Sequence, residues 1–136
     1  MANQPEDLKY TKTHEWVRRR GAQVNGAPGA IEVGITDFAQ HQLADITYVE
    51  LPEIGQQLAA GEEAGVVESI KAAADVYAPV TGVITEINPG LATAPEAINT
   101  DPYGQGWLFR MTPKNLEDVD GLMDADQYQS SLPEEH

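Results

Sequence analysis

Short apolar runs separated by glycine and proline constrain the fold of this chain more than any other feature. The sequence contains 12 glycines and 9 prolines, and many of them lie between runs rich in Val, Ile and Tyr. Runs of this kind, bounded by turn residues, are typical of short β-strands. Because they recur along most of the chain, they favour a small sandwich or barrel. The expected strands cover residues 10–20, 31–35, 46–51, 64–70, 76–80, 83–87 and 107–111.

Two places in the sequence predict short helices. Thr36 is a suitable N-cap for a helix over residues 37–43, because its hydroxyl can accept a backbone N–H of the first turn. Near the C-terminus, Asn115 and Asp124 are each predicted to cap one of two helices within residues 115–132.

The length of 136 residues and the hydrophobic fraction of 41% suit one domain with a substantial core. We therefore predict a single domain over residues 1–136, with a flexible N-terminus at 1–8 and a loose tail at 133–136. Residues 21–29 are rich in glycine and indicate a hairpin loop. This loop lacks the spacing of a phosphate-binding loop.

Charge and cysteine content exclude several classes of function. The net charge of −14 repels nucleic-acid phosphates and anionic membranes, so neither is an expected partner. It favours partners with basic patches. The absence of cysteine excludes disulfides, thiolate nucleophiles and cysteine-based zinc sites. A polar start and the lack of an apolar run of transmembrane length predict a cytoplasmic protein.

Lys71 is isolated among acidic residues. The 89 residues between Arg20 and Arg110 contain 12 acidic residues and only this one Lys or Arg. Lys71 lies between two strand-like runs and is followed by three alanines, so no bulky side chain shields it. Most lysines are simply exposed and solvated, but an unshielded amine on a turn suits covalent modification. Glu68 and Asp75 lie close enough in sequence to hold the ammonium or to guide a modifying enzyme.

The segment Glu68-Ser69-Ile70-Lys71-Ala72, followed by Asp75 and by Tyr77-Ala78-Pro79-Val80-Thr81-Gly82, resembles the lipoyl-attachment motif of the glycine cleavage system H protein family. The resemblance extends from about Leu8 to Leu132, nearly the whole chain. Further matching blocks lie at residues 10–17, 33–37, 39–40, 48–52, 99–104 and 106–108, with Asp124, Ala125 and Tyr128 near the end.

The resemblance implies a carrier and not an enzyme. The implied fold is mainly β: a flattened, lipoyl-domain-like β-barrel or hammerhead sandwich with a short helix after the first hairpin and C-terminal helices. Lys71 would carry covalent lipoate. The arm would collect the aminomethyl group of glycine from the pyridoxal-phosphate-dependent glycine decarboxylase and pass it to the aminomethyltransferase. Dihydrolipoamide dehydrogenase would then reoxidise the dithiol of the arm. A separate lipoyl-attaching enzyme would have attached the lipoate to Lys71 beforehand.

The resemblance also implies roles for other residues. Glu15, Asp75 and Thr13 would line a cleft where the loaded arm docks, since carboxylates suit a cationic aminomethyl group. Glu68 would help the modifying enzyme to recognise the lysine. Gly55 and Gly82 match glycines that flank the lysine in lipoyl domains, and we expect positive φ at both.

Several positions depart from the family pattern or have ordinary structural interpretations. Ala44 stands where the family usually has glycine, so a positive φ there would cost about 1 kcal/mol. Ala74 replaces a frequent Ser or Thr, and Val83 replaces a common Glu. The run of arginines at 18–20 is expected to be a solvated strand end, and Trp107 is expected in the core.

Other functions remain open from the sequence. An H-like protein could relay lipoate to other enzymes, or the chain could be an unmodified acidic binding module. Biotin carriage is disfavoured because Ile70 and Ala72 flank the lysine where biotin domains usually have methionine. A zinc site at His14-Glu15 is poorly supported, because Arg18 occupies the place of a second histidine. No nucleophile–base set indicates an autonomous enzyme.

Overall fold

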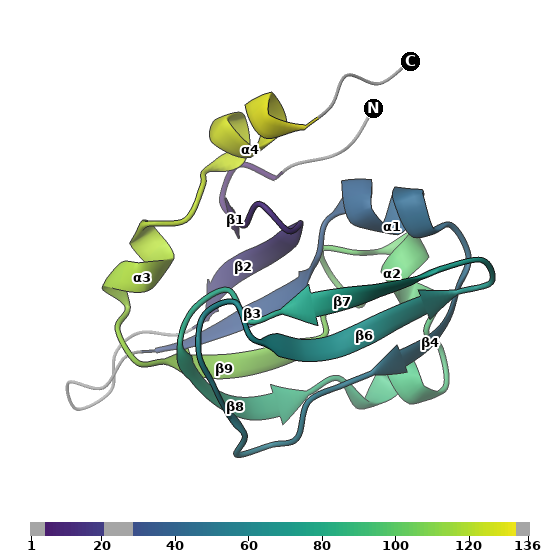
Figure 1. The fold of residues 1–136 in the computed structure, drawn as a ribbon, viewed down its shortest axis with the longest axis horizontal. Coiled ribbons are helices and arrows are strands. Elements are labelled where there is room, and N and C mark those ends of the chain that lie inside the picture. The colour runs from purple at the N-terminus through teal and green to yellow at the C-terminus, as the bar shows by residue number, and fades with distance from the viewer. Residues whose placement is uncertain (1–4, 21–28, 133–136) are drawn as a thin grey trace.

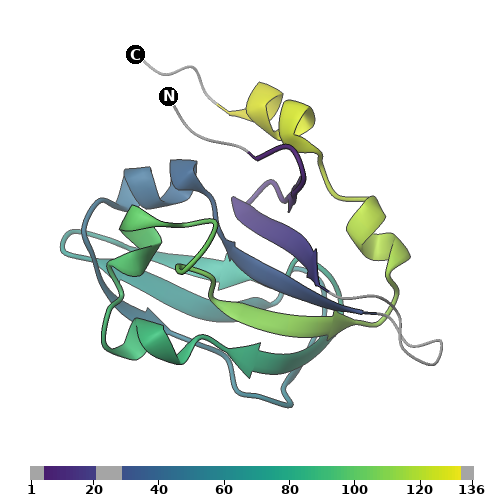
Figure 2. The ribbon, with the colours of Figure 1, turned by 180° about the vertical axis from the view of Figure 1, so that it is seen from behind.

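Two antiparallel β-sheets and several short helices make up the computed structural model, which describes residues 5–20 and 29–132 (Figures 1 and 2). The larger sheet consists of β1 (Lys9–Tyr10), β2 (Glu15–Arg20), β3 (Ala30–Ile35), β5 (Gln57–Leu58), β8 (Gly82–Ile87) and β9 (Phe109–Pro113). The smaller sheet consists of β4 (Ile46–Glu50), β6 (Glu63–Ser69) and β7 (Ala73–Tyr77). The predicted mainly β fold class is confirmed.

The strand order of the smaller sheet places β7 at an edge. The larger sheet has the order β1-β2-β3-β9-β8-β5, and the smaller has the order β4-β6-β7. The hairpin that joins β6 to β7 projects at one end of the molecule (Figure 1). The predicted loop at 21–29, apart from its last residue, and the predicted tail at 133–136 lie outside the described residues, as do residues 1–4 of the predicted flexible start.

The main core lies between the two sheets. The larger sheet contributes Val17, Val33 and Met111, and the smaller sheet contributes Val67 and Val76 to the same buried cluster. Side chains alternate along a strand, so every second residue of these strands faces the opposite sheet. Burial of these faces fixes the register of the strands that carry the site.

A second, aromatic cluster lies on the other face of β2. Tyr10 and Tyr128 stack with ring centroids 4.7 Å apart and an angle of 9° between the ring planes. Trp16 belongs to this cluster because it points away from the side on which Val17 enters the main core. The cluster fixes the C-terminal helix α4 (Ala125–Ser131) against β1 and β2 (Figure 2).

Helix caps agree with the sequence at two of three positions. α1 spans Asp37–Leu43 as predicted, and Thr36 accepts a first-turn N–H through its side chain. Asp124 caps α4 within a capping box, also as predicted. The prediction for Asn115 is wrong, because α3 (Glu117–Asp120) begins after Leu116 and has no side-chain cap. In the described part of the chain, no helix is long and apolar enough to cross a membrane.

Three predicted strands differ in the structure. The strand expected over 10–20 is divided, since a turn separates β1 from β2 and His14 adopts φ 75° within it. The strand expected over 107–111 begins and ends two residues later, as β9. The strand expected over 76–80 is wrong in its bounds, because β7 pairs with β6 from Ala73, opposite Glu68, to Tyr77. Cross-strand pairing overrides the weak strand preference of alanine there, and the hairpin turn is correspondingly short.

Other differences concern loops and glycines. Between the expected strands at 83–87 and 107–111, where no helix was predicted, the chain forms a 3-10 helix, η1 (Pro89–Ala92), and α2 (Ala97–Thr100). The short strand β5 was also not predicted. Gly55 has the predicted positive φ of 91°. Gly82 does not, so that prediction is wrong. Instead, a Cβ there would lie 2.3 Å from the backbone oxygen of Thr112, and close strand packing explains the glycine.

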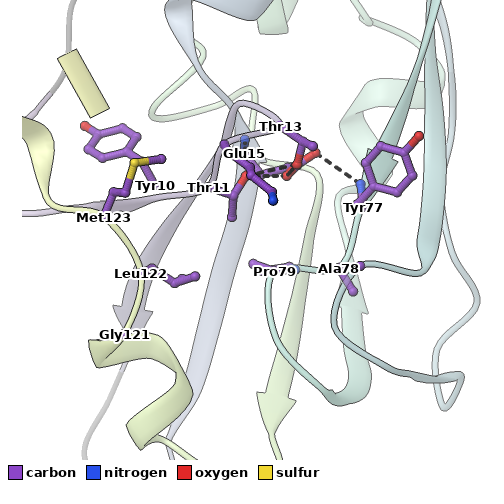
Figure 3. A pocket seen from close by; sticks show the side chains of 12 residues that line it. Tyr10, Thr11, Thr13, Glu15, Tyr77, Ala78, Pro79, Gly121, Leu122 and Met123 are labelled. Atoms are coloured by element: carbon purple, nitrogen blue, oxygen red, sulfur yellow. Dashed lines mark hydrogen bonds between the residues drawn. The ribbon is translucent and has the colours of Figure 1, made fainter. Parts of the chain in front are cut away.

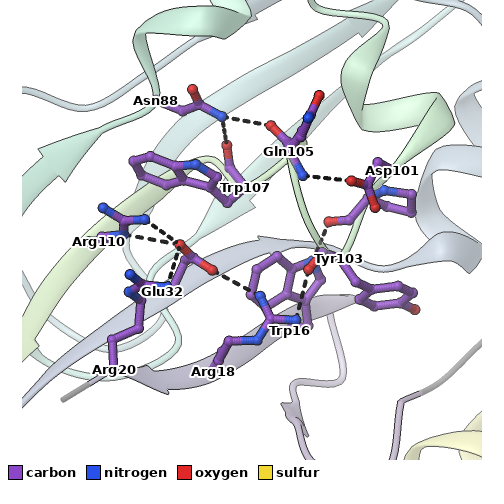
Figure 4. Close-up of polar contacts among 11 residues, drawn as sticks. Trp16, Arg18, Arg20, Glu32, Asn88, Asp101, Tyr103, Gln105, Trp107 and Arg110 are labelled. Atoms are coloured by element: carbon purple, nitrogen blue, oxygen red, sulfur yellow. Dashed lines mark hydrogen bonds and ion pairs between the residues drawn. The ribbon is translucent and has the colours of Figure 1, made fainter.

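The arginine run is not simply solvated. Glu32 is 3% exposed and lies between Arg18 on β2 and Arg110 on β9, with N–O distances of 2.9 and 2.8 Å (Figure 4). Arg20 lies 3.7 Å away. Trp107 is half-buried and not in the core as expected, and the Arg110 guanidinium lies 4.1 Å from its ring centroid. These charges therefore join neighbouring strands of the larger sheet.

Candidate functional site

Lys71 lies at the tip of the β6–β7 hairpin. The turn is closed by the Ser69 N–H, which donates to the Ala72 oxygen at 2.8 Å. The Ser69 hydroxyl accepts from the Ala72 N–H at 3.1 Å. Lys71, Ala72 and Ala73 are all exposed. A hydrogen-bonded turn thus presents Lys71 to solvent, with small alanines directly after it.

The outer face of the smaller sheet carries exposed apolar and acidic side chains beside the lysine. Ile70 is 77% exposed and Tyr48 is 53% exposed. Tyr48 lies directly across from Glu68 in the β4–β6 ladder, and Glu68 is also exposed. This face is the part of the surface that an enzyme acting on Lys71 would meet first.

Glu15 is a buried carboxylate at the start of β2. It is 1% exposed. Its Oε1 accepts from the Thr11 and Thr13 hydroxyls, each at 2.5 Å. Its Oε2 accepts from the backbone N–H of Tyr77 at 3.1 Å (Figure 3). The carboxylate therefore bridges the turn before β2 to the end of the edge strand β7.

Burial raises the pKa of Glu15, although the Thr11, Thr13 and Tyr77 hydrogen bonds oppose this by stabilising the charged form. Among the described residues, no Lys, Arg or His forms an ion pair with Glu15. A buried carboxylate without a cation is costly and is characteristic of functional sites.

A cavity of about 270 Å³ lies between α1 and the β6–β7 hairpin. Thr13, Glu15 and Asp75 line it, so the structure brings together the three residues predicted for a docking cleft. Asp75 is exposed and accepts from the Tyr77 hydroxyl at 3.4 Å. The remaining lining residues are mostly apolar; they are His14, Ile35, Phe38, Ala39, Gln42, Leu43, Val67, Ala74 and Val76.

The sequence did not identify the apolar wall of this cavity. Phe38 and Leu43 lie on the predicted helix over residues 37–43, for which no role in the site was predicted, and His14 was considered only as part of a zinc pair. One feature of the sequence could have indicated the cavity. The helix over residues 37–43 has a narrow apolar face, and such a helix can cover only a small area of core.

A second cavity, of about 550 Å³, is also lined by the Thr11–Glu15 turn (Figure 3). Thr13 and Glu15 line this cavity as well as the smaller one. Its other walls come from the end of β7 and from the link before α4; they include Tyr10, Pro79, Leu122 and Met123. The Glu15 turn therefore contributes to the walls of both cavities.

An exposed lysine at the tip of a hairpin that also lines a mostly apolar cavity with a carboxylate at its wall is the arrangement expected of a carrier-type domain. The sequence matches the family described as "Glycine cleavage H-protein" over residues 8–135. The chain belongs to this family, as the sequence motifs indicated.

Individual relatives support the same assignment. The glycine cleavage system H protein of Halorhodospira halophila is 51% identical over 135 residues, which cover 99% of each chain. That of Psychrobacter sp. is 50% identical over 132 residues, covering 97% of this chain and 100% of the relative. The crystal structure of a glycine cleavage system H protein from Mycobacterium marinum has a TM-score of 0.81 and 40% identity. The structural match covers 94% of this chain and 99% of the Mycobacterium marinum chain.

Proposed function

We propose that Lys71 carries the lipoyl group of this H protein and that the smaller cavity receives the loaded arm. As a family member the chain is a non-catalytic lipoyl carrier of the glycine cleavage system. The observation that carries the assignment to Lys71 is its exposure at the tip of a closed hairpin whose inner face lines the cavity. When bound, the lipoyl group supplies a disulfide that takes up the aminomethyl group of glycine and is later reoxidised.

The residues present fit a long arm with a cationic end. Acylation of Lys71 removes its charge and leaves an extended hydrocarbon chain. The apolar side chains of Ile35, Phe38 and Val67 suit that chain, and Glu15 suits a positive group at its end. The hairpin supports both parts of this arrangement, because it holds Lys71 at its tip and contributes Val67 to the cavity wall.

We propose distinct roles for the polar residues of the cleft. Glu15 provides the counter-charge for the aminomethyl group, and Thr13 orients the carboxylate through its hydrogen bond. Asp75 adds a second negative charge at the exposed side of the cavity. Together they would keep the load in the cleft and away from water between enzymes.

The proposed partners follow from the cycle of the carrier. They are glycine decarboxylase, the aminomethyltransferase, dihydrolipoamide dehydrogenase and a lipoyl-attaching enzyme. Glu68 would be recognised by the attaching enzyme, since it is exposed one strand position from the turn. The cytoplasmic location and the single domain over residues 1–136 remain predictions, which cell fractionation and limited proteolysis would test.

The decisive experiment is a mass spectrum of the Lys71 peptide from protein produced with lipoate. We expect the lipoyl increment on Lys71. The variant Lys71→Arg should fold normally but lack both the increment and glycine–bicarbonate exchange with the decarboxylase. Lys114→Arg, at another exposed lysine, is the matched control and should retain both. Exchange activity in Lys71→Arg, or a lipoyl group on another residue, would refute the assignment.

A further inference from the structure

Three polar side chains connect the C-terminal helix α4 to the turn that carries Glu15. His14 Nδ1 lies 2.8 Å from the Tyr128 hydroxyl, which in turn lies 2.7 Å from Thr36 Oγ1. Tyr128 and Thr36 are both 0% exposed, and His14 is half-buried. The His14 ring also lines the smaller cavity. Groups from three distant parts of the chain therefore meet beside Glu15.

The buried hydroxyls determine where the imidazole proton lies. Thr36 Oγ1 already accepts the Ala39 N–H at 3.2 Å. If His14 Nδ1 were protonated, it would donate to Tyr128 and Tyr128 would donate to Thr36. The Thr36 hydroxyl hydrogen would then have no partner among the contacts of the described residues, which is costly for a buried group.

The opposite direction pairs both hydroxyl hydrogens. Thr36 donates to the Tyr128 oxygen, and Tyr128 donates to Nδ1 of His14. The ring proton of His14 is then on Nε2. Burial lowers the pKa of His14, which keeps the ring neutral, and burial also raises the pKa of Tyr128 to about 12, which keeps its hydroxyl a donor.

The backbone of His14 depends on such anchoring. Its φ of 75° is unfavourable for a residue with a side chain. Its N–H donates to the Thr11 oxygen at 3.1 Å, and its oxygen accepts the Thr36 N–H at 3.0 Å. The Tyr128 hydroxyl adds the side-chain contact, so the conformation of the residue before Glu15 is held from three directions.

We propose that Thr36, Tyr128 and His14 form a hydrogen-bond relay that holds His14 as the neutral Nε2–H tautomer and so positions Glu15 at the cavity. The inference rests on the proposed docking of the arm at Glu15. A neutral ring adds no positive charge to the cavity, so a cationic load meets the carboxylate unopposed. Tyr128 makes α4 part of the site, and His14 and Tyr128 are positioning residues.

The tautomer is tested on protein without lipoate. Nitrogen-15 magnetic resonance of the histidine rings at pH 7, with His14 assigned through His14→Gln, should show a single Nε2–H tautomer. In Tyr128→Phe, where Nδ1 loses its donor, His14 should show a mixture of tautomers. An Nδ1–H or doubly protonated ring in the wild type, or an unchanged tautomer in Tyr128→Phe, would overturn the relay.

The effect on the load is tested with the aminomethylated holoprotein. Tyr128→Phe should release the aminomethyl group into buffer roughly 2- to 10-fold faster than the wild type, as expected for one lost hydrogen bond. Tyr10→Phe is the matched control, because Tyr10 stacks on Tyr128 but its hydroxyl bonds the Pro5 oxygen at 2.6 Å. It should release the load at the wild-type rate.

The possible results separate the relay from the docking proposal. Wild-type release in Tyr128→Phe, or equal acceleration in both tyrosine variants, would overturn the relay, since equal acceleration would indicate lost packing. If Glu15→Gln itself did not accelerate release, the docking of the load at Glu15 would fail. The tautomer measurement, which needs no load, would still decide whether the relay exists.

Discussion

Replacing Glu15 by glutamine removes the buried charge proposed to hold the load while keeping the size of the side chain. A hydrogen bond to a charged group contributes about 1.5–3 kcal/mol. Each tenfold in rate corresponds to about 1.4 kcal/mol, so we expect release from the holoprotein to accelerate roughly 10- to 150-fold. Two unit charges about 4 Å apart at an effective dielectric constant of about 20 interact by about 4 kcal/mol, which sets the upper limit.

The fold should tolerate this substitution. The amide oxygen of the introduced glutamine can still accept from the threonine hydroxyls, but its NH₂ group cannot accept the Tyr77 N–H, a mismatch that costs about 1–3 kcal/mol. Removal of a buried charge offsets part of that cost. The net change in the free energy of unfolding should therefore be small.

The assay loads the protein with glycine and the decarboxylase, removes the enzyme, and follows loss of the aminomethyl group by intact mass at pH 7. Glu50→Gln is the control, because it makes the same charge change at an exposed position on β4. Release at the wild-type rate from folded Glu15→Gln would refute the role of Glu15. Equal acceleration in Glu50→Gln would show that net charge, and not the cleft, controls release.

Three further predictions concern stability and can be checked by thermal or urea unfolding. Ala44→Gly should stabilise the fold by about 1 kcal/mol, because Ala44 has φ 65°; a loss of stability would contradict this. Gly82→Ala should destabilise it by about 1–3 kcal/mol, since the new Cβ would meet the Thr112 oxygen, and an unchanged midpoint would count against that packing. The pKa of Glu15 is raised above its ordinary value of 4.5, so the folded state binds this proton more readily than the unfolded state. Its contribution to stability is thus present below pH 4.5 and lost as the pH rises through the folded pKa. The free energy of unfolding of the wild type, less that of Glu15→Gln, should therefore be greater at pH 4 than at pH 7.

Local chemistry made part of the fold predictable. The start of α1 follows from the Thr36 hydroxyl, which accepts a backbone N–H of the first turn. The Asp124 carboxylate marks the start of α4 in the same way. The positive φ at Gly55 was expected from the resemblance to lipoyl domains, but the same expectation was wrong at Gly82, where strand packing requires the glycine. The two helix caps depend on a few neighbouring residues and not on the rest of the chain.

Other features depend on partners far away in sequence. The register of β7 is set by β6 across the hairpin, so a run of alanines became a strand. The turn between β1 and β2 contains no glycine or proline, and His14 takes a positive φ because Thr36 and Tyr128 hold it. The place of Lys71 at a turn between two strands, in contrast, was predictable from its own neighbours, since a hairpin tip is a local feature.

Among the described residues, two glutamates are buried, and they differ in whether a cation balances their charge. Glu32, 3% exposed, has Arg18 and Arg110 within hydrogen-bond distance, so its charge is neutralised within the fold. Glu15, 1% exposed, accepts from hydroxyls and from the Tyr77 N–H, forms no ion pair among the described residues, and has its pKa raised by burial. Hydrogen bonds alone, without a nearby cation, offset only part of the desolvation free energy of the buried carboxylate. A cationic group that enters the cavity would supply the missing counter-charge, so the fold's own electrostatics favour the loaded arm over an uncharged one.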